Sequence, residues 1–200
     1  MSSDFIYLAS GSPRRRELLR QIGVRFRVLG ATVEEAVFAG ETGEAYVERL
    51  AAAKADAGWA RHPEAGRAPV LAADTAVILD GGILGKPLDP EDGEAMLRRL
   101  SGRTHVVLTA VALRTADGRR ARISRSEVTF RALADEEIRA YWKTGEPGDK
   151  AGGYAVQGAA AVFIADLRGS FSGVMGLPLF ETAELLREAG VGYWQALEPP

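Results

Sequence analysis

The chain has 200 residues, 46% hydrophobic and 26% charged, which is the composition of a soluble globular protein with a sizeable core. The formal net charge of -2 provides no global basic field, which argues against a nucleic-acid partner. Zero cysteines and two histidines exclude disulfides, thiolate metal sites and cysteine nucleophiles, and argue against a multi-histidine zinc site. No apolar run approaches the roughly 20 residues of a membrane span or forms a signal-peptide core, so we expect a cytoplasmic protein without membrane contact.

The first predicted strand, over residues 5–9, leads directly into a basic helix start. Ser12 is a good N-cap and Pro13 suits the first helical position. Arginines in a first helical turn face the positive end of the helix dipole, so a bound anion would stabilise them. We therefore predict a phosphate-binding turn, built from Ser10, Ser12, Arg14 and Arg15.

An alternative interpretation of this turn is purely structural. In it the arginines are solvated, and Arg16 or Arg20 pairs with Glu17. The few lysines of the chain are a separate observation. Arginine predominates so strongly that each remaining lysine is a candidate for contact with a phosphate; the lysines are Lys54, Lys86, Lys143 and Lys150.

Between this turn and the middle of the chain, a strand, a loop and a helix are predicted. Apolar residues that alternate with arginines around Val28 indicate a half-buried strand, and residues 30–43 form a loop that carries Glu35. The helix predicted over 44–58 carries Lys54 on or beside its apolar face. This lysine either contacts a ligand or extends to solvent from the edge of that face.

The most informative strand is predicted over residues 70–79. Its near-continuous apolar run is typical of the middle of a sheet, but Asp74 interrupts the run. A buried carboxylate is costly unless it is paired, hydrogen-bonded or bound to a metal. Asp74 is therefore a candidate for catalysis or metal binding; the alternative is an aspartate satisfied by nearby backbone or a cation.

The remainder of the chain interleaves helices and strands. A hairpin turn leads to Lys86, but the glycine spacing before it does not match a Walker A loop. His105 is expected to be structural, because it has no partner histidine. We predict helices over 90–100, 135–144 and 179–189, strands over 105–113, 122–131 and 159–167, a polar loop over 62–69, and glycine-rich connections over 146–158 and 170–178. Without internal repeats, this pattern predicts a single α/β domain over residues 1–200.

Several separated motifs occur in one order along the chain. They are Ser10-Gly11-Ser12-Pro13-Arg14-Arg15, Ala73-Asp74-Thr75, Gly85-Lys86-Pro87, Leu100-Ser101-Gly102-Arg103-Thr104-His105, Asp149-Lys150-Ala151-Gly152-Gly153-Tyr154 with Gln157-Gly158, and Val174-Met175-Gly176-Leu177-Pro178-Leu179. Together they resemble the Maf family of nucleoside triphosphate pyrophosphatases, also called the septum formation inhibitor family, over nearly the whole chain. The pattern from Lys150 to Gly158 resembles the branch that acts on dTTP and UTP.

The resemblance implies a fold related to that of Ham1-type inosine triphosphatases. This is an elongated α/β fold with a mixed twisted sheet, flanking helices and a cleft between two lobes. It also implies hydrolysis of dTTP, UTP or modified pyrimidine triphosphates between the α- and β-phosphates with Mg²⁺ or Mn²⁺, and it is compatible with a homodimer. By position, Asp74 corresponds to the proton acceptor, and the specificity positions are Arg14, Thr75 and Gln157.

The same residues suit this chemistry independently of the resemblance. Attack of water on a phosphorus atom needs a base or a metal to activate the water, and cations to accept charge on the leaving group. Asp74 and Glu35 are the acidic candidates and the predicted metal ligands. Whether Asp74 takes the proton itself or holds the metal that acidifies the water stays open. The predicted cations are Arg14, Arg15, Lys54 and Lys86.

Gln157 offers one amide carbonyl and one amide NH₂, which complement the N3–H and O4 of uracil or thymine. A freely flipping amide would also suit cytosine, so we expect a neighbouring residue to fix its orientation.

Two alternative functions accompany this hypothesis. One is a pyrophosphatase for purine nucleotides such as ITP and XTP, against which the Gln157 loop argues, and the other is a non-catalytic nucleotide-binding regulator of septum formation.

Overall fold

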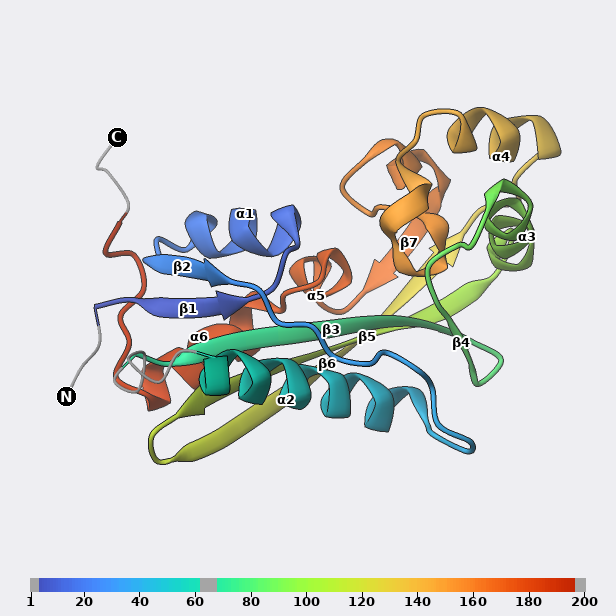
Figure 1. Ribbon diagram of the computed structural model, residues 1–200. Coiled ribbons are helices and arrows are strands. Elements are labelled where there is room, and N and C mark those ends of the chain that lie inside the picture. The colour runs from blue at the N-terminus through green and yellow to red at the C-terminus, as the bar shows by residue number, and fades with distance from the viewer. Residues whose placement is uncertain (1–3, 62–67, 197–200) are drawn as a thin grey trace.

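One mixed sheet of seven strands organises the computed structural model, which describes residues 4–61 and 68–196 (Figure 1). The strands follow the order β2-β1-β3-β5-β6-β7, and β4 pairs with β3. Their bounds are β1 (Ile6–Ala9), β2 (Phe26–Leu29), β3 (Val70–Leu79), β4 (Gly82–Leu84), β5 (Thr104–Thr115), β6 (Gly118–Phe130) and β7 (Ile164–Arg168). β1 pairs in parallel with β2 and β3, and the remaining pairs are antiparallel.

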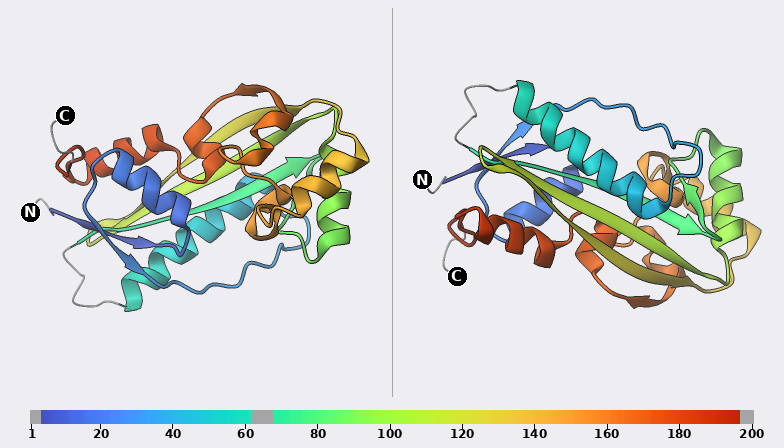
Figure 2. Two further views of the ribbon diagram at one scale, coloured as in Figure 1. Left: turned by 90° about the horizontal axis from the view of Figure 1, so that it is seen from above. Right: turned by 90° about the horizontal axis from the view of Figure 1, so that it is seen from below.

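Helices cover both faces of this sheet. They are α1 (Pro13–Gln21), α2 (Gly43–Arg61), α3 (Pro90–Leu100), α4 (Asp135–Trp142), α5 (Phe171–Met175) and α6 (Leu179–Glu188), with short 3₁₀ turns η2 (Pro147–Asp149), η3 (Ala151–Gly153) and η4 (Ala159–Phe163). Figure 2 shows α2 on one face of the long strands, opposite α1 and α6. In the described part of the chain, no helix combines the length and apolar character that a membrane span requires.

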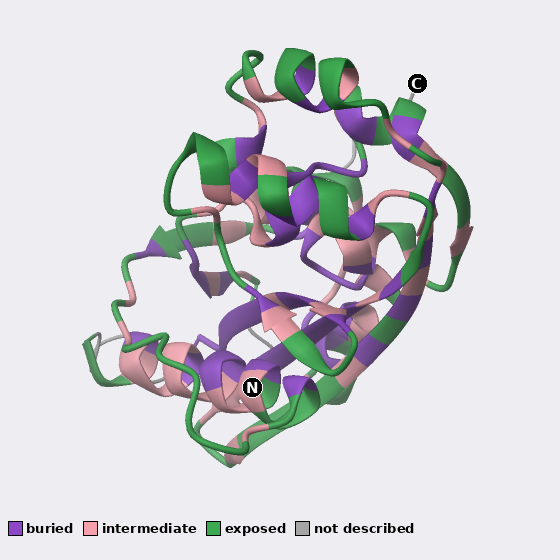
Figure 3. Cartoon of the chain, turned by 90° about the vertical axis from the view of Figure 1, so that its right-hand side faces the viewer, coloured by how far each residue is buried: buried purple, intermediate pink, exposed green. Residues whose placement is uncertain are grey.

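Apolar side chains gather in three clusters that match this layering. One joins α2 to β3 and β5, a second joins α1 and α6 to the other face of these strands, and a third lies among α3, α4 and the far end of the sheet. In Figure 3 the buried residues concentrate along the strands and on the inner sides of the helices. Figure 1 shows α1, β1 and β2 toward one end of the long strands and α3 and α4 toward the other. The expected elongated α/β fold with a mixed sheet is confirmed.

Successive residues of β3 serve opposite faces of the sheet, as the pleat requires. Ala72 and Ala76 pack in the cluster with α2, whereas Ala73 packs in the cluster with α1 and α6. Asp74 therefore faces the α2 side, and Thr75 faces the α1 side.

β3 lacks a neighbouring strand over residues 72–76 on one side, among the residues that the structure describes. On that side, β1 pairs with Val70 and Leu71, and β4 pairs with β3 only from Val77 onward. On its other side β3 pairs with β5 continuously from Val70 to Ile78. This gap gives side chains from both faces of β3 access to one opening.

Most predicted elements are confirmed. β3 and α3 have the predicted bounds, and Ser12 accepts a hydrogen bond from the Arg15 amide as the N-cap of α1. The hairpin between β3 and β4 pairs Ile78 with Ile83. Most of the loop predicted over 62–69 lies outside the described residues.

Three predictions of local structure are wrong. The strand predicted over 159–167 begins only at Ile164, because the preceding backbone turns in η4. The connection predicted over 170–178 contains α5, whose N-cap Ser170 accepts a hydrogen bond from the Gly173 amide. The strand predicted around Val28 is present as β2, but the expected burial of Val28 is wrong: this residue is 46% exposed on an edge strand and joins none of the three apolar clusters.

Candidate functional site

A cavity of about 620 Å³ opens beside the gap in β3. Its wall combines the turn before α1, the middle of β3, the segment after β4 and the glycine-rich segment near residue 150. The structure brings all ten predicted site residues to this wall: Ser10, Ser12, Arg14, Arg15, Glu35, Lys54, Asp74, Thr75, Lys86 and Gln157.

An ammonium group joins the two acidic candidates. Lys54 extends from the buried side of α2, and its Nζ lies 2.6 Å from Asp74 Oδ1 and 2.5 Å from Glu35 Oε1. Asp74 is only 7% exposed, so its carboxylate has lost most of its contact with water. Lys54 therefore does not extend to solvent from the edge of its helix face, and its contact with a ligand stays a prediction.

The surroundings shift the pKa values of these two carboxyl groups in opposite directions. Burial raises the pKa of Asp74 above its usual value, although the charge and hydrogen bond of Lys54 oppose this shift. Burial also raises the pKa of Glu35, but the hydrogen bond and charge of Lys54 and the charge of Lys86 bring it below its usual value. Of the two carboxyl groups, only Asp74 has a pKa above its usual value.

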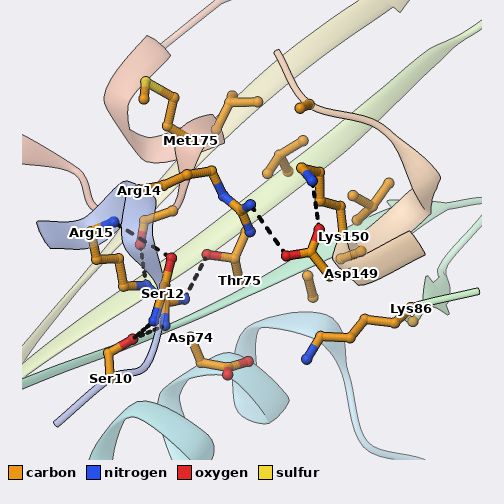
Figure 4. A pocket seen from close by; sticks show the side chains of 18 of the residues that line it. Ser10, Ser12, Arg14, Arg15, Asp74, Thr75, Lys86, Asp149, Lys150 and Met175 are labelled. Carbon is orange, nitrogen blue, oxygen red and sulfur yellow. Dashed lines mark hydrogen bonds and ion pairs between the residues drawn. The ribbon is translucent and has the colours of Figure 1, made fainter. Parts of the chain in front are cut away.

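Arg15 braces three separate parts of the wall. Its Nε donates to the Gly176 carbonyl at 2.7 Å, Nη1 donates to Ser10 Oγ at 3.0 Å, and Nη2 donates to Thr75 Oγ1 at 3.4 Å (Figure 4). Burial lowers the pKa of Arg15, and the charge of Asp74 opposes this change. Since several donors already have protein acceptors, the Arg15 guanidinium organises the wall as well as contributing positive charge to it.

The hydroxyl of Thr75 belongs to a directed chain of hydrogen bonds. Thr109 Oγ1 donates to the Gly173 carbonyl at 2.7 Å, which uses its single proton. Thr75 must then donate to Thr109 across the 2.9 Å between their oxygens, while it accepts from Arg15. Thr75 is thereby fixed in one orientation.

Arg14 and Lys86 are the cations with the most freedom toward a ligand. Arg14 Nη1 lies 3.6 Å from Asp149 Oδ2, and the Lys150 ammonium donates to the same aspartate at 2.5 Å. Lys86 forms no ion pair with any described residue, and Figure 4 shows its ammonium extending toward Asp74.

The pairing of Arg16 with Glu17, which the alternative interpretation of the basic turn predicts, is not found in the described structure. The Nε atom of Arg16 is buried without a hydrogen-bond partner.

Gln157 lies at the rim of the cavity with an exposed side chain. Its amide makes no hydrogen bond to any described residue, so the neighbour expected to fix its orientation is not found there. Its position depends instead on the backbone turn that carries it.

Sequence reasoning missed several residues that shape the cavity. Arg49 holds the loop before α2: its guanidinium donates twice to Glu41, at 2.6 and 2.7 Å, and once to the Ala36 carbonyl at 2.9 Å. Tyr46 donates to the Glu35 carbonyl at 3.1 Å. Thr109 could have been found by the signal that revealed Asp74, since it is a polar residue within an apolar strand.

His105 has a structural environment, as predicted. It is buried, its Nε2 lies 2.8 Å from the Tyr154 hydroxyl, and its ring packs edge-on against Phe130. Burial lowers the pKa of His105 to about 4, so the ring is neutral at physiological pH.

Among the described residues, the acidic side chains of the cavity wall do not form a complete metal site. The described residues contain no group of three or more His, Cys, Asp or Glu side chains placed to enclose a metal. Asp74 and Glu35 nonetheless supply two carboxylates within reach of one Lys54 ammonium. Magnesium is commonly held by one or two carboxylates together with water and substrate phosphates.

A buried carboxylate facing several cations defines the class of site, which suits hydrolysis of a phosphate-bearing anion. The family follows from sequence comparison. The chain belongs to the Maf family, because the family model described as Maf-like protein matches residues 5–189.

Curated relatives cover nearly the whole chain. The dTTP/UTP pyrophosphatase of Aromatoleum aromaticum is 56% identical over 92% of this chain and 95% of its own length. The dTTP/UTP pyrophosphatase of Methylococcus capsulatus is 57% identical over 94% of this chain and 92% of its own length. Among solved structures, the Staphylococcus aureus Ham1 protein matches 65% of this chain and 72% of its own, with 18% identity and a TM-score of 0.42.

Proposed function

We propose that this protein hydrolyses dTTP and UTP to the nucleoside monophosphate and pyrophosphate. The observation that carries the chemistry is the buried Asp74 carboxylate, whose pKa is raised, in a cavity lined by Lys54, Lys86 and Arg14. The substrate is inferred from relatives that are 55–57% identical and are named dTTP/UTP pyrophosphatase. Modified pyrimidine triphosphates belong to the same substrate class.

In the proposed reaction a water oxygen bonds to the α-phosphorus while the bond from that phosphorus to the bridging oxygen breaks. Asp74 takes the proton of the water or holds the metal that acidifies it. Arg14 and Lys86 neutralise charge on the departing pyrophosphate, and Ser10 and Ser12 line the same wall. Arg15 adds charge and keeps Thr75 in its fixed orientation.

We assign the divalent cation to Asp74 and Glu35. When bound, Mg²⁺ or Mn²⁺ would supply polarisation of the phosphate oxygens and a lower pKa for the attacking water. Lys54 lies between the two carboxylates and limits their mutual repulsion. Removal of divalent cations by a chelator should therefore abolish turnover.

The test is a substrate panel with product identification. The purified chain is incubated with dTTP, UTP, modified pyrimidine triphosphates, ITP and 7-methyl-GTP, with Mg²⁺ or Mn²⁺ supplied separately. We expect monophosphate and pyrophosphate from dTTP and UTP and no products from 7-methyl-GTP. The proposal is wrong if no triphosphate is turned over, or if orthophosphate replaces pyrophosphate as the product.

We further propose that residues 1–200 act as one domain, because strands from both halves of the chain join one sheet. We also propose a cytoplasmic location, because nucleoside triphosphates are cytoplasmic metabolites. The homodimer and the absence of a nucleic-acid partner stay predictions.

A further inference from the structure

The backbone turn at residues 155–158 carries Gln157 on the cavity rim. The Gly158 amide donates to the Ala155 carbonyl at 3.1 Å and closes this turn. Because the Gln157 amide has no partner of its own among the described residues, the position of the turn decides where that amide lies. The contacts that hold the turn are therefore candidates for controlling base recognition.

One carboxylate and one phenol hold the turn from both ends. Glu146 accepts hydrogen bonds from the Ala159 amide at 3.0 Å and the Ala160 amide at 3.4 Å, just after the turn. Tyr141 donates to Glu146 at 2.7 Å and accepts from the Ala155 amide at 3.2 Å, at the start of the turn. Both ends of the turn are thus tied to the same pair of side chains.

Gly158 leaves the space that this arrangement needs. A Cβ atom at this position would collide with the Glu146 carboxylate. The backbone of Gly158 has φ −106°, which other residues adopt without strain. The requirement for glycine is therefore one of space for the carboxylate and not of backbone conformation.

The charge state of Glu146 matches its donors. Burial raises the pKa of Glu146, but hydrogen bonds from Tyr141 and from the Ala159 and Ala160 amides lower it below its usual value. The ionised carboxylate has only acceptor oxygens, so it can satisfy a hydroxyl and two amides together. Glutamine could not, since its NH₂ group would face one of these donors.

We propose that Glu146, supported by Tyr141, is a positioning residue that holds Gln157 at the nucleobase end of the cavity and so sets base affinity. This role rests on the proposed function. Glu146 also anchors Lys150, but through its main-chain carbonyl, which accepts from the Lys150 ammonium at 2.6 Å. A change confined to the Glu146 side chain therefore disturbs the turn and leaves that carbonyl in place.

The test measures recognition of the base-containing part of the substrate and of its pyrophosphate part separately. Binding of dTMP and of pyrophosphate to the wild type and to Glu146→Gln is measured by titration calorimetry. We expect the dissociation constant for dTMP to rise about tenfold, as for loss of a hydrogen bond to a charged group. The dissociation constant for pyrophosphate, which has no base, should stay unchanged, and amide hydrogen exchange at Ala159 and Ala160 should accelerate.

A second variant and a matched control make the result specific. Tyr141→Phe should weaken dTMP binding in the same direction, because it releases the Ala155 end of the turn. The control is Glu137→Gln, which changes another glutamate that accepts a backbone amide, from Ala134, outside the cavity wall. This control should bind both ligands as the wild type does.

The positioning role is overturned if Glu146→Gln and Tyr141→Phe retain wild-type affinity for dTMP, if pyrophosphate affinity falls equally, or if the wild type binds no dTMP. Turnover of dTTP is measured separately on the wild type. Failure of that reaction alone contradicts the proposed function, whereas unchanged dTMP binding in the variants contradicts only the role of Glu146.

Discussion

At the scale of single residues, Asp74 and Thr75 show how one strand can supply two kinds of group. Asp74 faces α2 and meets Lys54, whereas Thr75 faces the opposite side and accepts from Arg15. Both reach the cavity because β3 has no strand beside it there. Two adjacent residues of one strand therefore place a buried carboxylate and a hydroxyl of fixed orientation in the same cavity.

We predict that Asp74→Asn separates catalysis from binding and stability. Turnover of dTTP should fall at least about 100-fold, because the base or metal ligand is lost. Nucleotide affinity should persist, and the thermal unfolding midpoint should be equal or higher, because a costly buried charge is removed while Lys54 keeps Glu35 as a partner. Pyrophosphate release, nucleotide titration and calorimetry measure the three quantities.

The matched control is Asp166→Asn, an exposed aspartate paired with Arg168 outside the cavity wall, which should behave as the wild type in all three measurements. Wild-type turnover by Asp74→Asn would contradict the proposed role of Asp74.

At the scale of elements, α2 supports the cavity through residues on two of its sides. Lys54 reaches Asp74, while Arg49 and Tyr46 tie the preceding loop to the helix and so define where Glu35 lies. The Arg49 guanidinium also lies 4.0 Å from the centre of the Phe38 ring. The loop thus depends on α2 for its shape, although it contains no helix or strand among its described residues.

We predict that Arg49→Ala loosens this loop and lowers kcat/KM for dTTP about tenfold, because Glu35 loses its fixed position. Amide hydrogen exchange over residues 35–41 should accelerate. Arg98→Ala, which removes an arginine paired with Glu94 and Asp135 elsewhere on the surface, should change neither quantity. Unchanged exchange in Arg49→Ala would show that the loop is held by other contacts.

The long elements and the short ones differ in how far the sequence could predict them. β3 and the start of α1 follow from local signals, an apolar run and a Ser-Pro cap, that act within a few residues. In contrast, η4 is held by Glu146, which accepts from the Ala159 amide across 13 positions of sequence. The Arg15 brace likewise ends on Gly176, and the two residues lie 161 positions apart. The Arg15 contact exists only once the fold has brought these two distant segments together.

At the scale of the whole molecule, His105 makes the free energy of unfolding depend on pH, because it is buried against one of the apolar clusters. Its ring is buried beside Tyr154 and Phe130, and its Nδ1 has no hydrogen-bond partner among the described residues. Burial lowers its pKa from the ordinary 6.5 to about 4, so protonation in the folded state is disfavoured.

We predict that this histidine makes the protein less stable in mild acid. Below pH 6.5 the unfolded chain binds a proton that the folded chain takes up only near pH 4, so the free energy of unfolding falls as pH falls between these values. The contribution lost between pH 8 and pH 5 is about 2 kcal/mol. Denaturant unfolding of the wild type and His105→Gln at both pH values measures it, and equal losses in the two proteins would contradict the assignment.

The gap beside β3 also bears on aggregation. An unpaired strand edge is a template for a strand of another molecule, and proteins protect such edges by keeping them short or by placing charges there. Here β1 and β4 confine the open edge to residues 72–76, about the length of a single short strand. The short length of the open edge therefore limits pairing with a strand of another molecule.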